Sequence, residues 1–286
     1  MDDTLYPRSC GINVACRKKI EEYMLKYLHM DESEVPQMCL DLYMEHGTTM
    51  AGLKALGYEF ENEEFHAYVH GTLPYDSLKP DPVLRNLLLS LPQRKIIFTN
   101  ADKAHAAQVL ERLDLEDCFE GVICFETLNN NNNNNPSLER KCNGGNGIIL
   151  CKPSIEAIQA AIKIADTHPN KTIFFDDSVR NIESGKAAGL HTVIVGSWEL
   201  VPGADHALGS IHNIKEALPE LWEGEEDEND QPEQAMQAPV VETMLQQFRV
   251  SMPSTPTCFR TYASLILPKV RMQVIMYVGI VVGHVV

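Results

Sequence analysis

The sequence has no cluster of positive charge, and this absence argues against general binding to nucleic acids or anionic membranes. It contains 24 Lys and Arg against 40 Asp and Glu, a formal net charge of −16, whereas both kinds of partner select clustered basic residues. The acidity is uneven, because eight acidic residues and no Lys or Arg lie between Glu220 and Glu233. We interpret this run as a solvated acidic linker.

Paired cysteines and an apolar leader are also lacking. The eight Cys residues are scattered without a CxxC pair or zinc-like spacing, and at 286 residues the chain is too long to need disulfides. No charged segment followed by an apolar one opens the chain, so no signal peptide is expected. We therefore expect reduced thiols and an intracellular location, with the cytoplasm preferred over the nucleus.

Only the C-terminal end is apolar over a long run. Residues 272–286 read MQVIMYVGIVVGHVV, and Lys269 and Arg271 prevent the run from extending backwards. The run is shorter than the ~20 residues that a membrane span needs, so we expect no membrane partner, although a tail anchor is an alternative. We interpret residues 218–286 as an acidic linker followed by an irregular, non-native tail, because an exposed run of this kind favours aggregation.

The periodicity of apolar residues changes along the chain. Helical spacing covers residues 13–29, 34–45, 49–56 and 61–69, with no convincing buried strand between them. From residue 81 onward, short apolar runs at 95–98, 121–125, 171–175 and 191–195 alternate with helical patterns. This alternation predicts an α/β fold with a Rossmann-like parallel sheet and helices on both faces. Within it, the Asn-rich segment 129–147 is expected to be a disordered loop.

Polar residues with phosphoryl-transfer chemistry stand where these strands end. Thr99 and Asn100 follow one strand, Asp176 and Asp177 follow another, and Lys152 enters a helix. Ligands of open parallel sheets bind at the carboxyl ends of the strands. Carboxylates gather hard cations, and Lys and hydroxyl groups stabilise the charge of a transferring phosphoryl group. The Asp2-Asp3-Thr4 loop at the start of the chain adds further carboxylates.

The order and the local sequences of these motifs resemble those of the haloacid dehalogenase-like hydrolase superfamily. The segments MDDTLYP, FTNADKAHA, FFDDSVRNI and AAGLHTVIVG look like its pyrimidine 5′-nucleotidase-like branch in the plant form. The resemblance implies a catalytic core formed by residues 1–10 and 76–217 and a small all-helical cap formed by residues 11–75. It also implies Mg²⁺ as cofactor and a small phosphorylated metabolite as substrate.

The family's opening loop has the form Asp-x-Asp-x-Thr, which aligns Thr4 with its last position and Asp2 with the general acid/base. The nucleophilic Asp would then precede Met1, together with the apolar strand that carries it. We therefore expect a truncated chain with impaired activity. The alternative, in which Asp2 is the nucleophile and Thr4 takes the acid/base position, would put Tyr6 where a Thr is expected.

The remaining motif positions are occupied. By resemblance, Thr99 binds the phosphoryl oxygens, Asn100 shapes its loop and Lys152 neutralises the aspartyl-phosphate. Asp177 matches the Mg²⁺-binding carboxylate, with Asp176 as support or as a further ligand, and Asp2 belongs to the same metal site. A turn or helix N-cap is the lesser alternative for the Asp pair, whereas Lys152 taken alone would be interpreted as a surface lysine.

Three classes of function follow from these residues. The first is an Mg²⁺-dependent phosphatase that acts on a small phosphate monoester, such as a pyrimidine nucleoside 5′-monophosphate, through an aspartyl-phosphate. The second is a truncated form that binds Mg²⁺ or ligand without turnover. The third, a phosphoacceptor receiver domain, is disfavoured because the Asp pair comes last in the chain.

Histidines receive little weight in this interpretation. His66 and His70 have the i, i+4 spacing of helical metal ligands, but no third ligand is evident, and a surface or packing role is preferred. His105 and His191 lack evident partners. Neither the substrate nor the oligomeric state can be read from the sequence.

Overall fold

The computed structural model describes residues 1–130, 149–222 and 273–274. The chain divides into two compact units, Met1–Glu223 with Arg271–Val286 and the intervening Gly224–Val270. All described residues belong to the first unit. Most of the Asn-rich segment and of the expected acidic linker and tail lies outside the described residues.

The first part of the chain is helical, which confirms the prediction from its periodicity. The four helices are α1 (Ile12–Tyr27), α2 (Val35–His46), α3 (Thr49–Ala55) and α4 (Asn62–His70). Gly47 ends α2 with a left-handed φ of 86°, a conformation that Gly adopts without steric cost. The ring of Tyr23 on α1 lies 4.9 Å from that of Phe65 on α4, so aromatic contacts hold these two helices together.

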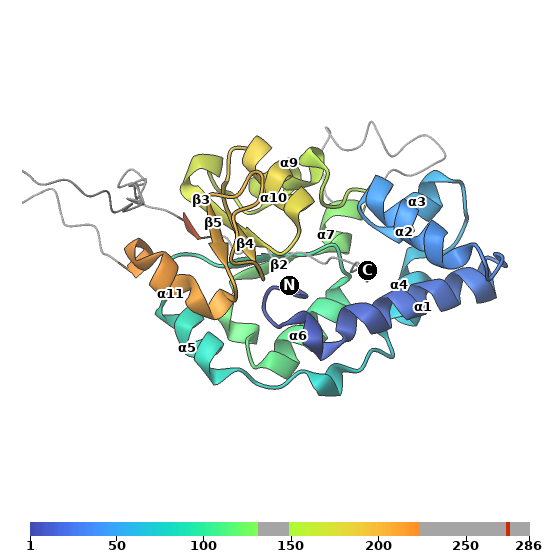
Figure 1. Ribbon diagram of the computed structural model, residues 1–286, viewed down its shortest axis with the longest axis horizontal. Coiled ribbons are helices and arrows are strands. Elements are labelled where there is room, and N and C mark those ends of the chain that lie inside the picture. Colours follow the sequence, from blue (N-terminus) through green and yellow to red (C-terminus); the bar gives the residue numbers. More distant parts are fainter. Residues whose placement is uncertain (131–148, 223–272, 275–286) are drawn as a thin grey trace, which may run out of the picture. The chain divides into compact units, whose positions relative to one another are not determined.

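The second part of the chain supplies parallel strands. They are β1 (Ile96–Phe98), β2 (Gly121–Ile123), β3 (Thr172–Asp176), β4 (His191–Val195), β5 (His206–Leu208) and β6 (Gln273–Val274). Among the described residues, β1 pairs only with β2, and a four-stranded sheet has the order β5-β4-β3-β6. All four pairings are parallel, and Figure 1 shows β3, β4 and β5 side by side. The predicted α/β class is confirmed.

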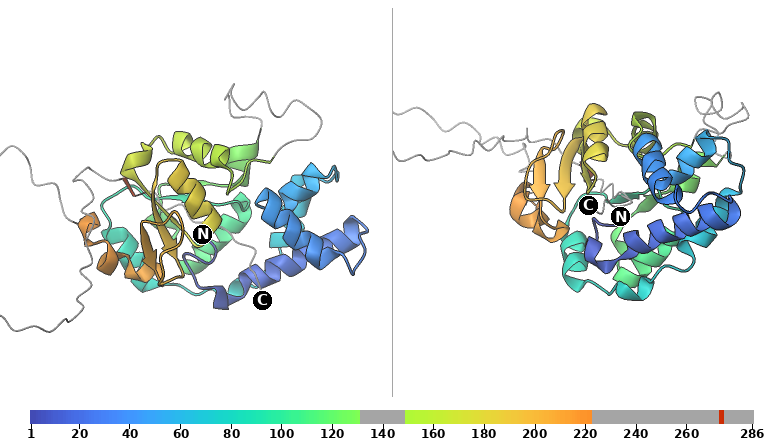
Figure 2. Two further views of the ribbon diagram at one scale, coloured as in Figure 1. Left: turned by 45° about the horizontal axis from the view of Figure 1, so that its top comes forward. Right: turned by 45° about the vertical axis from the view of Figure 1, so that its right-hand side comes forward.

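Helices connect the strands and cover both faces of the sheet layer. The α-helices of this part are α5 (Pro82–Ser90), α6 (Lys103–Leu113), α7 (Phe125–Asn129), α9 (Ile155–Ile164), α10 (Val179–Ala187) and α11 (Ile214–Ala217). Short 3₁₀ helices lie at Arg8–Cys10, Tyr75–Ser77, Glu116–Cys118, Pro169–Lys171, Ile211–Asn213 and Pro219–Trp222. Figure 2 gives two further views of this arrangement.

Alternate strand residues enter two different hydrophobic cores. Ile97 and Phe175 pack in one core with residues of α5, α6 and α11. Phe98 and Phe174 pack in the other with residues of α9 and α10. Because successive side chains of a strand point to opposite faces, these memberships show a sheet layer that is covered on both sides.

Some element boundaries differ from the sequence predictions. The expected strand 121–125 ends at Ile123, and Phe125 begins α7. The hydroxyl of Thr127 accepts from the backbone N–H of Cys124 at 3.1 Å, so a capping interaction ends the strand two residues early. The short strands β5 and β6 were not predicted, and β6 lies inside the segment expected to be irregular.

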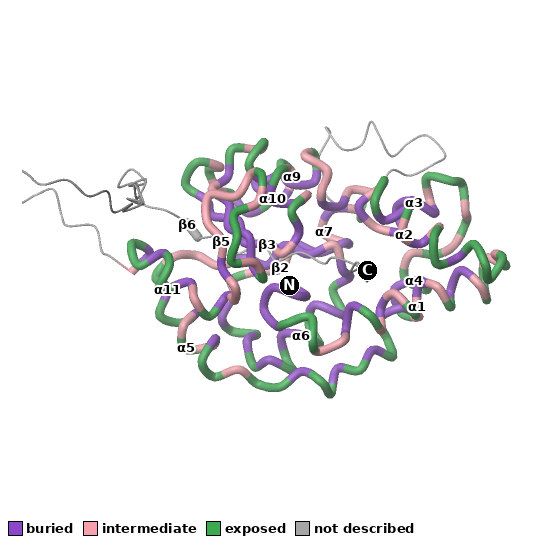
Figure 3. Tube along the Cα trace, in the orientation of Figure 1, coloured by how far each residue is buried: buried purple, intermediate pink, exposed green. Residues whose placement is uncertain are grey.

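The N-terminal loop is buried rather than solvated. Residues 1–6 are all buried (Figure 3), although they form no helix or strand. Leu5 donates its backbone N–H to the carbonyl of Met1 at 3.0 Å, and Asp3 takes a left-handed φ of 56° at this turn. The loop therefore brings two neighbouring carboxyl groups, of Asp2 and Asp3, into the interior. No helix in the described ranges is long and apolar enough to cross a membrane.

Candidate active site

A buried lysine connects the carboxyl ends of β1 and β3. The Lys152 ammonium donates to the carbonyl of Phe98, the last residue of β1, at 2.9 Å and to Asp176 Oδ2, at the end of β3, at 3.0 Å. Both side chains of this ion pair are fully buried. Asp176 Oδ1 accepts from the Ser178 N–H and from Asn181 Nδ2, each at 2.9 Å. We call Lys152, Asp176, Ser178 and Asn181 the Lys152 cluster.

The loop after β1 holds the backbone of Lys152 in place. The amide of Asn100 accepts from the Lys152 N–H at 2.8 Å and donates to the Lys152 carbonyl at 3.0 Å. Thr99 is fully buried, and its hydroxyl accepts from the Ala101 N–H at 3.1 Å. The structure therefore brings Thr99, Asn100 and Lys152 together, with Asn100 in a positioning role.

Asp177, the next residue after Asp176, has weaker partners. Its Oδ1 accepts from the Thr4 hydroxyl and its Oδ2 from the Arg8 guanidinium, both at 3.4 Å. Arg8 also pairs with Asp3 at 3.2 Å. Burial and the nearby carboxylates of Asp176 and Asp3 raise the pKa of Asp177 well above its ordinary range. Negative charge is therefore under-compensated beside Asp177.

Asp2 forms hydrogen bonds with side chains that carry rings. We call Asp2, Tyr6, Tyr75 and His105 the His105 cluster. Asp2 Oδ1 accepts from the Tyr6 hydroxyl and interacts with His105 Nε2 at 3.0 Å. His105 Nδ1 lies 2.7 Å from the hydroxyl of Tyr75. Within the described residues, Asp2 Oδ2 is buried without a hydrogen-bond partner. One Asp2 oxygen is thus fixed and the other is left for a group that enters the site.

The electrostatics of this cluster favour the ionised form of Asp2. Burial alone would raise the pKa of Asp2, but the charge and hydrogen bond of His105, together with the Tyr6 hydrogen bond, hold it below its ordinary value. A carboxylate accepts a proton from water, whereas only a carboxylic acid can donate one to a leaving oxygen. This arrangement therefore matches the base half of the role that the resemblance gives to Asp2.

A row of histidines continues from this cluster toward α4. His70 Nδ1 lies 2.5 Å from Asp102 Oδ1, and the rings of His66 and His70 stack with centroids 5.6 Å apart. Burial disfavours the charged form of both imidazoles and therefore lowers the pKa of each. The pKa of His66 falls to about 4. His66 and His70 are buried, so the packing interpretation of this pair is confirmed and the surface alternative is wrong.

The sequence motifs converge at Met1. Burial lowers the pKa of its amino group to about 4, and the charges that modify this shift are those of Asp2, Lys152, Asp176 and Asp177. The main chain at Met1 is therefore close enough to all four groups to interact with them electrostatically.

The carboxylates around Asp177 suit Mg²⁺ better than a metal whose ligands all come from protein side chains. Within the described ranges, no three His, Cys, Asp or Glu side chains are arranged to hold a metal by themselves. Mg²⁺ is commonly bound through one or two carboxylates, with water and substrate phosphate as its other ligands. Asp177, with its long hydrogen bonds and raised pKa, is a suitable carboxylate, whereas both Asp176 oxygens already accept hydrogen bonds.

Sequence reasoning missed the partners of Asp2 and Asp177. The sequence alone assigns no role to His105 or Arg8, yet His105 and Tyr6 contact Asp2 and Arg8 contacts Asp177. No local pattern connects His105 with Asp2, which is 103 positions away. No comparable local pattern connects Arg8 with Asp177, which is 169 positions away.

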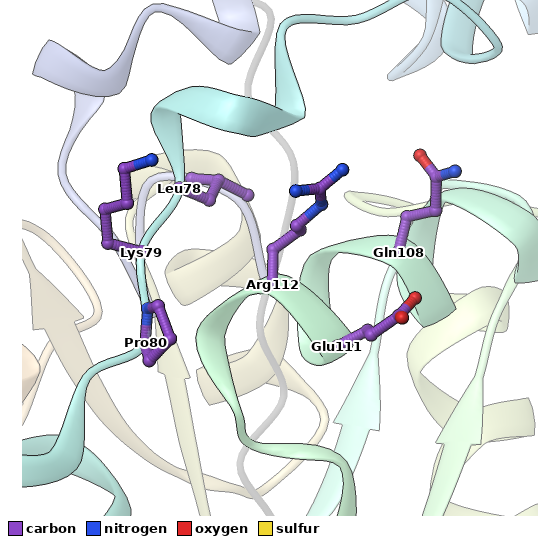
Figure 4. A pocket seen from close by; sticks show the side chains of 6 residues that line it. All are labelled: Leu78, Lys79, Pro80, Gln108, Glu111 and Arg112. Atoms are coloured by element: carbon purple, nitrogen blue, oxygen red, sulfur yellow. The ribbon is translucent and has the colours of Figure 1, made fainter.

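A surface hollow lies elsewhere on the molecule and shares no residue with this site. Its volume is about 320 Å³, and it is lined by Leu78, Lys79, Pro80, Gln108, Glu111 and Arg112. Figure 4 shows these side chains on α6 and on the segment before α5. Arg112 is already paired with Asp76 at 2.9 Å. We assign no ligand to this hollow.

Comparison with known proteins agrees with the motif set. The model of the haloacid dehalogenase-like hydrolase family matches residues 3–189, and the chain belongs to this family. Phosphate metabolism protein 8 of Saccharomyces cerevisiae is 25% identical over 203 residues, which cover 68% of this chain and 59% of that protein. The chain thus spans less than two thirds of this curated relative.

Similar solved structures include a HAD phosphatase from Thermococcus onnurineus. Its TM-score is 0.48 at 15% identity, over 76% of this chain and 94% of that one. The HAD-hydrolase YfnB of Bacillus subtilis, in a form bound to magnesium, has a TM-score of 0.45 at 16% identity, over 76% and 94% of the two chains.

Proposed function

We propose that this chain has the architecture of an Mg²⁺-dependent phosphohydrolase for a small phosphate monoester. The observation that carries the proposal is the Lys152 ammonium, fully buried beside Asp176, with Thr99 following the carbonyl that it contacts and Asp177 beside it. A buried ammonium and a hydroxyl stabilise the charge of a phosphoryl group. Membership of the haloacid dehalogenase-like hydrolase family supports this chemistry.

Each described residue has a distinct task in this proposal. Asp177 and the Asp2 loop would hold Mg²⁺, which when bound neutralises charge on the phosphoryl oxygens. Lys152 and Thr99 bind those oxygens, and Asn100 fixes the backbone of Lys152. Asp2 takes a proton from the attacking water at Oδ2, the atom that has no hydrogen-bond partner among the described residues.

Residues 11–75 are proposed to act as the cap that covers this site and selects the substrate, in line with the role of closing segments in other enzymes. Arg180 of α10 donates to the Met44 carbonyl near the end of α2 at 2.7 Å, and its guanidinium lies 4.6 Å from the centre of the Tyr43 ring. These contacts join the proposed cap to the helix that follows Asp177. The similarity of the motif sequences to the pyrimidine 5′-nucleotidase-like branch supports a pyrimidine nucleoside 5′-monophosphate as substrate.

The proposal does not assign the nucleophile to any residue of the 286-residue sequence. The motif alignment places it immediately before Met1, whose amino group interacts with the charges of Asp2, Lys152, Asp176 and Asp177. A carboxylate there would stand among the phosphoryl-binding groups. We propose that an Asp at this aligned position is the nucleophile of the reaction.

The test compares phosphate release by three polypeptides in the presence of Mg²⁺ and pyrimidine nucleoside monophosphates. The first is the 286-residue chain, and the others carry an added apolar strand before Met1 that ends in Asp or in Asn. Turnover is expected with the added Asp and not with the added Asn. No hydrolysis of any phosphate monoester by the Asp-extended chain would refute the phosphohydrolase proposal.

The role of Asp2 has its own control. If the 286-residue chain turns over, Asp2→Asn should abolish this turnover, while the exposed Glu183→Gln should not. The second candidate function is binding of ligand with Mg²⁺ without turnover, which requires Lys152, Thr99 and Asp177 but no nucleophile. Calorimetric binding of a nucleoside monophosphate with Mg²⁺, without phosphate release, would support it.

A further inference from the structure

A short chain of hydrogen bonds leads from Tyr75 to the carboxylate of Asp2. The Tyr75 hydroxyl lies 2.7 Å from His105 Nδ1, and His105 Nε2 lies 3.0 Å from Asp2 Oδ1. Tyr75 begins the 3₁₀ helix Tyr75–Ser77, whereas His105 lies in the first turn of α6. All three side chains are buried, so bulk water does not readily replace a partner that one of them loses.

The proton positions along this chain follow from its carboxylate end. A carboxylate can only accept hydrogen bonds, and a neutral imidazole has one donor nitrogen and one acceptor nitrogen. His105 Nε2 therefore donates to Asp2 Oδ1, and His105 Nδ1 is left as the acceptor. Among the described residues, the hydrogen-bond partner of Nδ1 is the Tyr75 hydroxyl, which has to be the donor of that bond.

A carbonyl group competes for the same hydroxyl proton. The Tyr75 hydroxyl also lies 3.1 Å from the His70 carbonyl. If the proton were donated there, His105 Nδ1 would have to carry a proton of its own, and the Nε2 lone pair of a neutral ring would face the Asp2 carboxylate. The shorter contact with Nδ1 favours donation to His105. The His70 carbonyl, moreover, already accepts from the Leu73 N–H at 3.3 Å.

The two oxygens of Asp2 differ because of this chain. Oδ1 interacts with His105 Nε2 and accepts from the Tyr6 hydroxyl, whereas Oδ2 has no hydrogen-bond partner within the described residues. The terminal torsion of an Asp side chain is broad and nearly two-fold. Hydrogen bonds to Oδ1, rather than the rotamer itself, therefore decide which of the two oxygens is available to substrate or water.

We propose that Tyr75 is a positioning residue of this site. By donating to His105 Nδ1, it fixes the tautomer that carries the proton on Nε2. This tautomer holds Asp2 by Oδ1 and leaves Oδ2 as the oxygen that exchanges a proton in the reaction. The effect of Tyr75 on the reaction is transmitted through His105. The catalytic part of the inference rests on the proposed function, whereas the tautomer of His105 does not.

Nitrogen NMR of the 286-residue chain with isotope-labelled histidine tests the tautomer without turnover. At neutral pH, His105 should carry a proton on Nε2 and none on Nδ1. In Tyr75→Phe, which keeps the ring, the Nδ1 signal should move to the position of an acceptor without a hydrogen bond. The control Tyr27→Phe, at a residue that is 48% exposed, should leave it unchanged. A proton on Nδ1 in the parent chain, or no shift in Tyr75→Phe, would overturn the proposal.

Kinetics of the polypeptide extended before Met1 by the strand that ends in Asp test the catalytic part. Tyr75→Phe should lower kcat at least ~10-fold, because a misplaced proton-transfer group loses much of its contribution. KM should change less than ~2-fold, because substrate binding does not use this group. Tyr27→Phe should change neither constant. An unchanged kcat in Tyr75→Phe would overturn the positioning role and leave the proposed function standing. No turnover by the extended parent would instead refute the proposed function, and the catalytic role of Tyr75 with it.

Discussion

The Lys152 cluster and the His105 cluster are both buried, but they compensate their carboxylates differently. Asp176 has an ammonium and two further donors for its two oxygens. Asp2 Oδ1 interacts with both Tyr6 and His105, while Oδ2 has no hydrogen-bond partner in the described part of the chain. The first arrangement fixes the ends of two strands, and the second leaves one buried carboxylate oxygen available to a group that enters the site. The difference separates groups that hold the site from groups that act in it.

Removing the ammonium of the Lys152 cluster should have the largest effect. Lys152→Met leaves the Asp176 carboxylate buried without its counter-charge, and we expect the free energy of unfolding to fall by about 3–5 kcal/mol. Urea denaturation at pH 7 measures this loss. The matched control is Lys186→Met, which breaks the solvent-accessible pair with Asp205 and should cost less than ~1 kcal/mol. Equal losses in both variants would contradict the structural role of the Lys152 cluster.

Acid should destabilise the protein through the histidine row beside the His105 cluster. His66 has an ordinary pKa of 6.5, which burial and the neighbouring His70 and His105 lower to about 4 against the opposing charge of Asp102. Between these values the unfolded chain binds a proton that the folded chain excludes, so stability falls as the pH falls from 6.5 to about 4. The loss approaches about 3 kcal/mol, at ~1.4 kcal/mol per pH unit.

Urea unfolding across this pH range, with His66→Gln and the exposed His29→Gln, isolates the contribution. The His66 variant should lose a large part of the acid sensitivity, and the His29 variant should retain it. The same pH dependence in His66→Gln as in the parent would show that another group is responsible.

A smaller effect is expected from the hydrogen bond on Asp2. His105→Leu leaves Asp2 Oδ1 with the Tyr6 hydroxyl alone, and stability should fall by about 2 kcal/mol. His105→Gln keeps a donor of similar reach and should recover part of the loss. If the Gln variant is no more stable than the Leu variant, the hydrogen bond to Asp2 does not account for the effect of His105.

The smallest stability effect should come from Arg8, whose side chain is 50% exposed where it pairs with Asp3 and Asp177. Arg8→Gln should change the free energy of unfolding by less than ~1 kcal/mol. Because the variant removes a positive charge beside Asp177, it should bind Mg²⁺ more tightly, as measured by calorimetry. Weaker Mg²⁺ binding in Arg8→Gln would place the ion elsewhere.

Much of this fold could be predicted because its signals are local. The apolar run before Thr99 and the run before Asp177 predicted two strands, and the alternation with helices predicted their parallel arrangement. The rule that ligands bind at the carboxyl ends of parallel strands then placed Thr99, Lys152 and Asp177 at one edge, and the contacts of Lys152 with Phe98 and Asp176 bring these ends together. The short strand β5 escaped prediction because three residues carry too little periodicity to be distinguished from a loop.

The contacts between distant segments could not be predicted in the same way. The pairing of β6 with β3 joins residues about 100 positions apart, and an apolar tail predicts equally an aggregating segment or a strand. The hydrogen bond of His105 to Asp2 spans 103 positions. Such contacts are decided by tertiary packing, on which the local pattern carries no information.

Mg²⁺ titration by isothermal calorimetry tests the central claim most directly, because it reports on the proposed metal site without requiring turnover. The 286-residue chain and the exposed control Glu183→Gln should bind one Mg²⁺ with the same affinity, and Asp177→Asn should bind it at least ~10-fold more weakly while retaining the circular dichroism spectrum of the parent. Equal affinity in the Asp177→Asn variant, or no Mg²⁺ binding by the folded parent chain, would contradict the account.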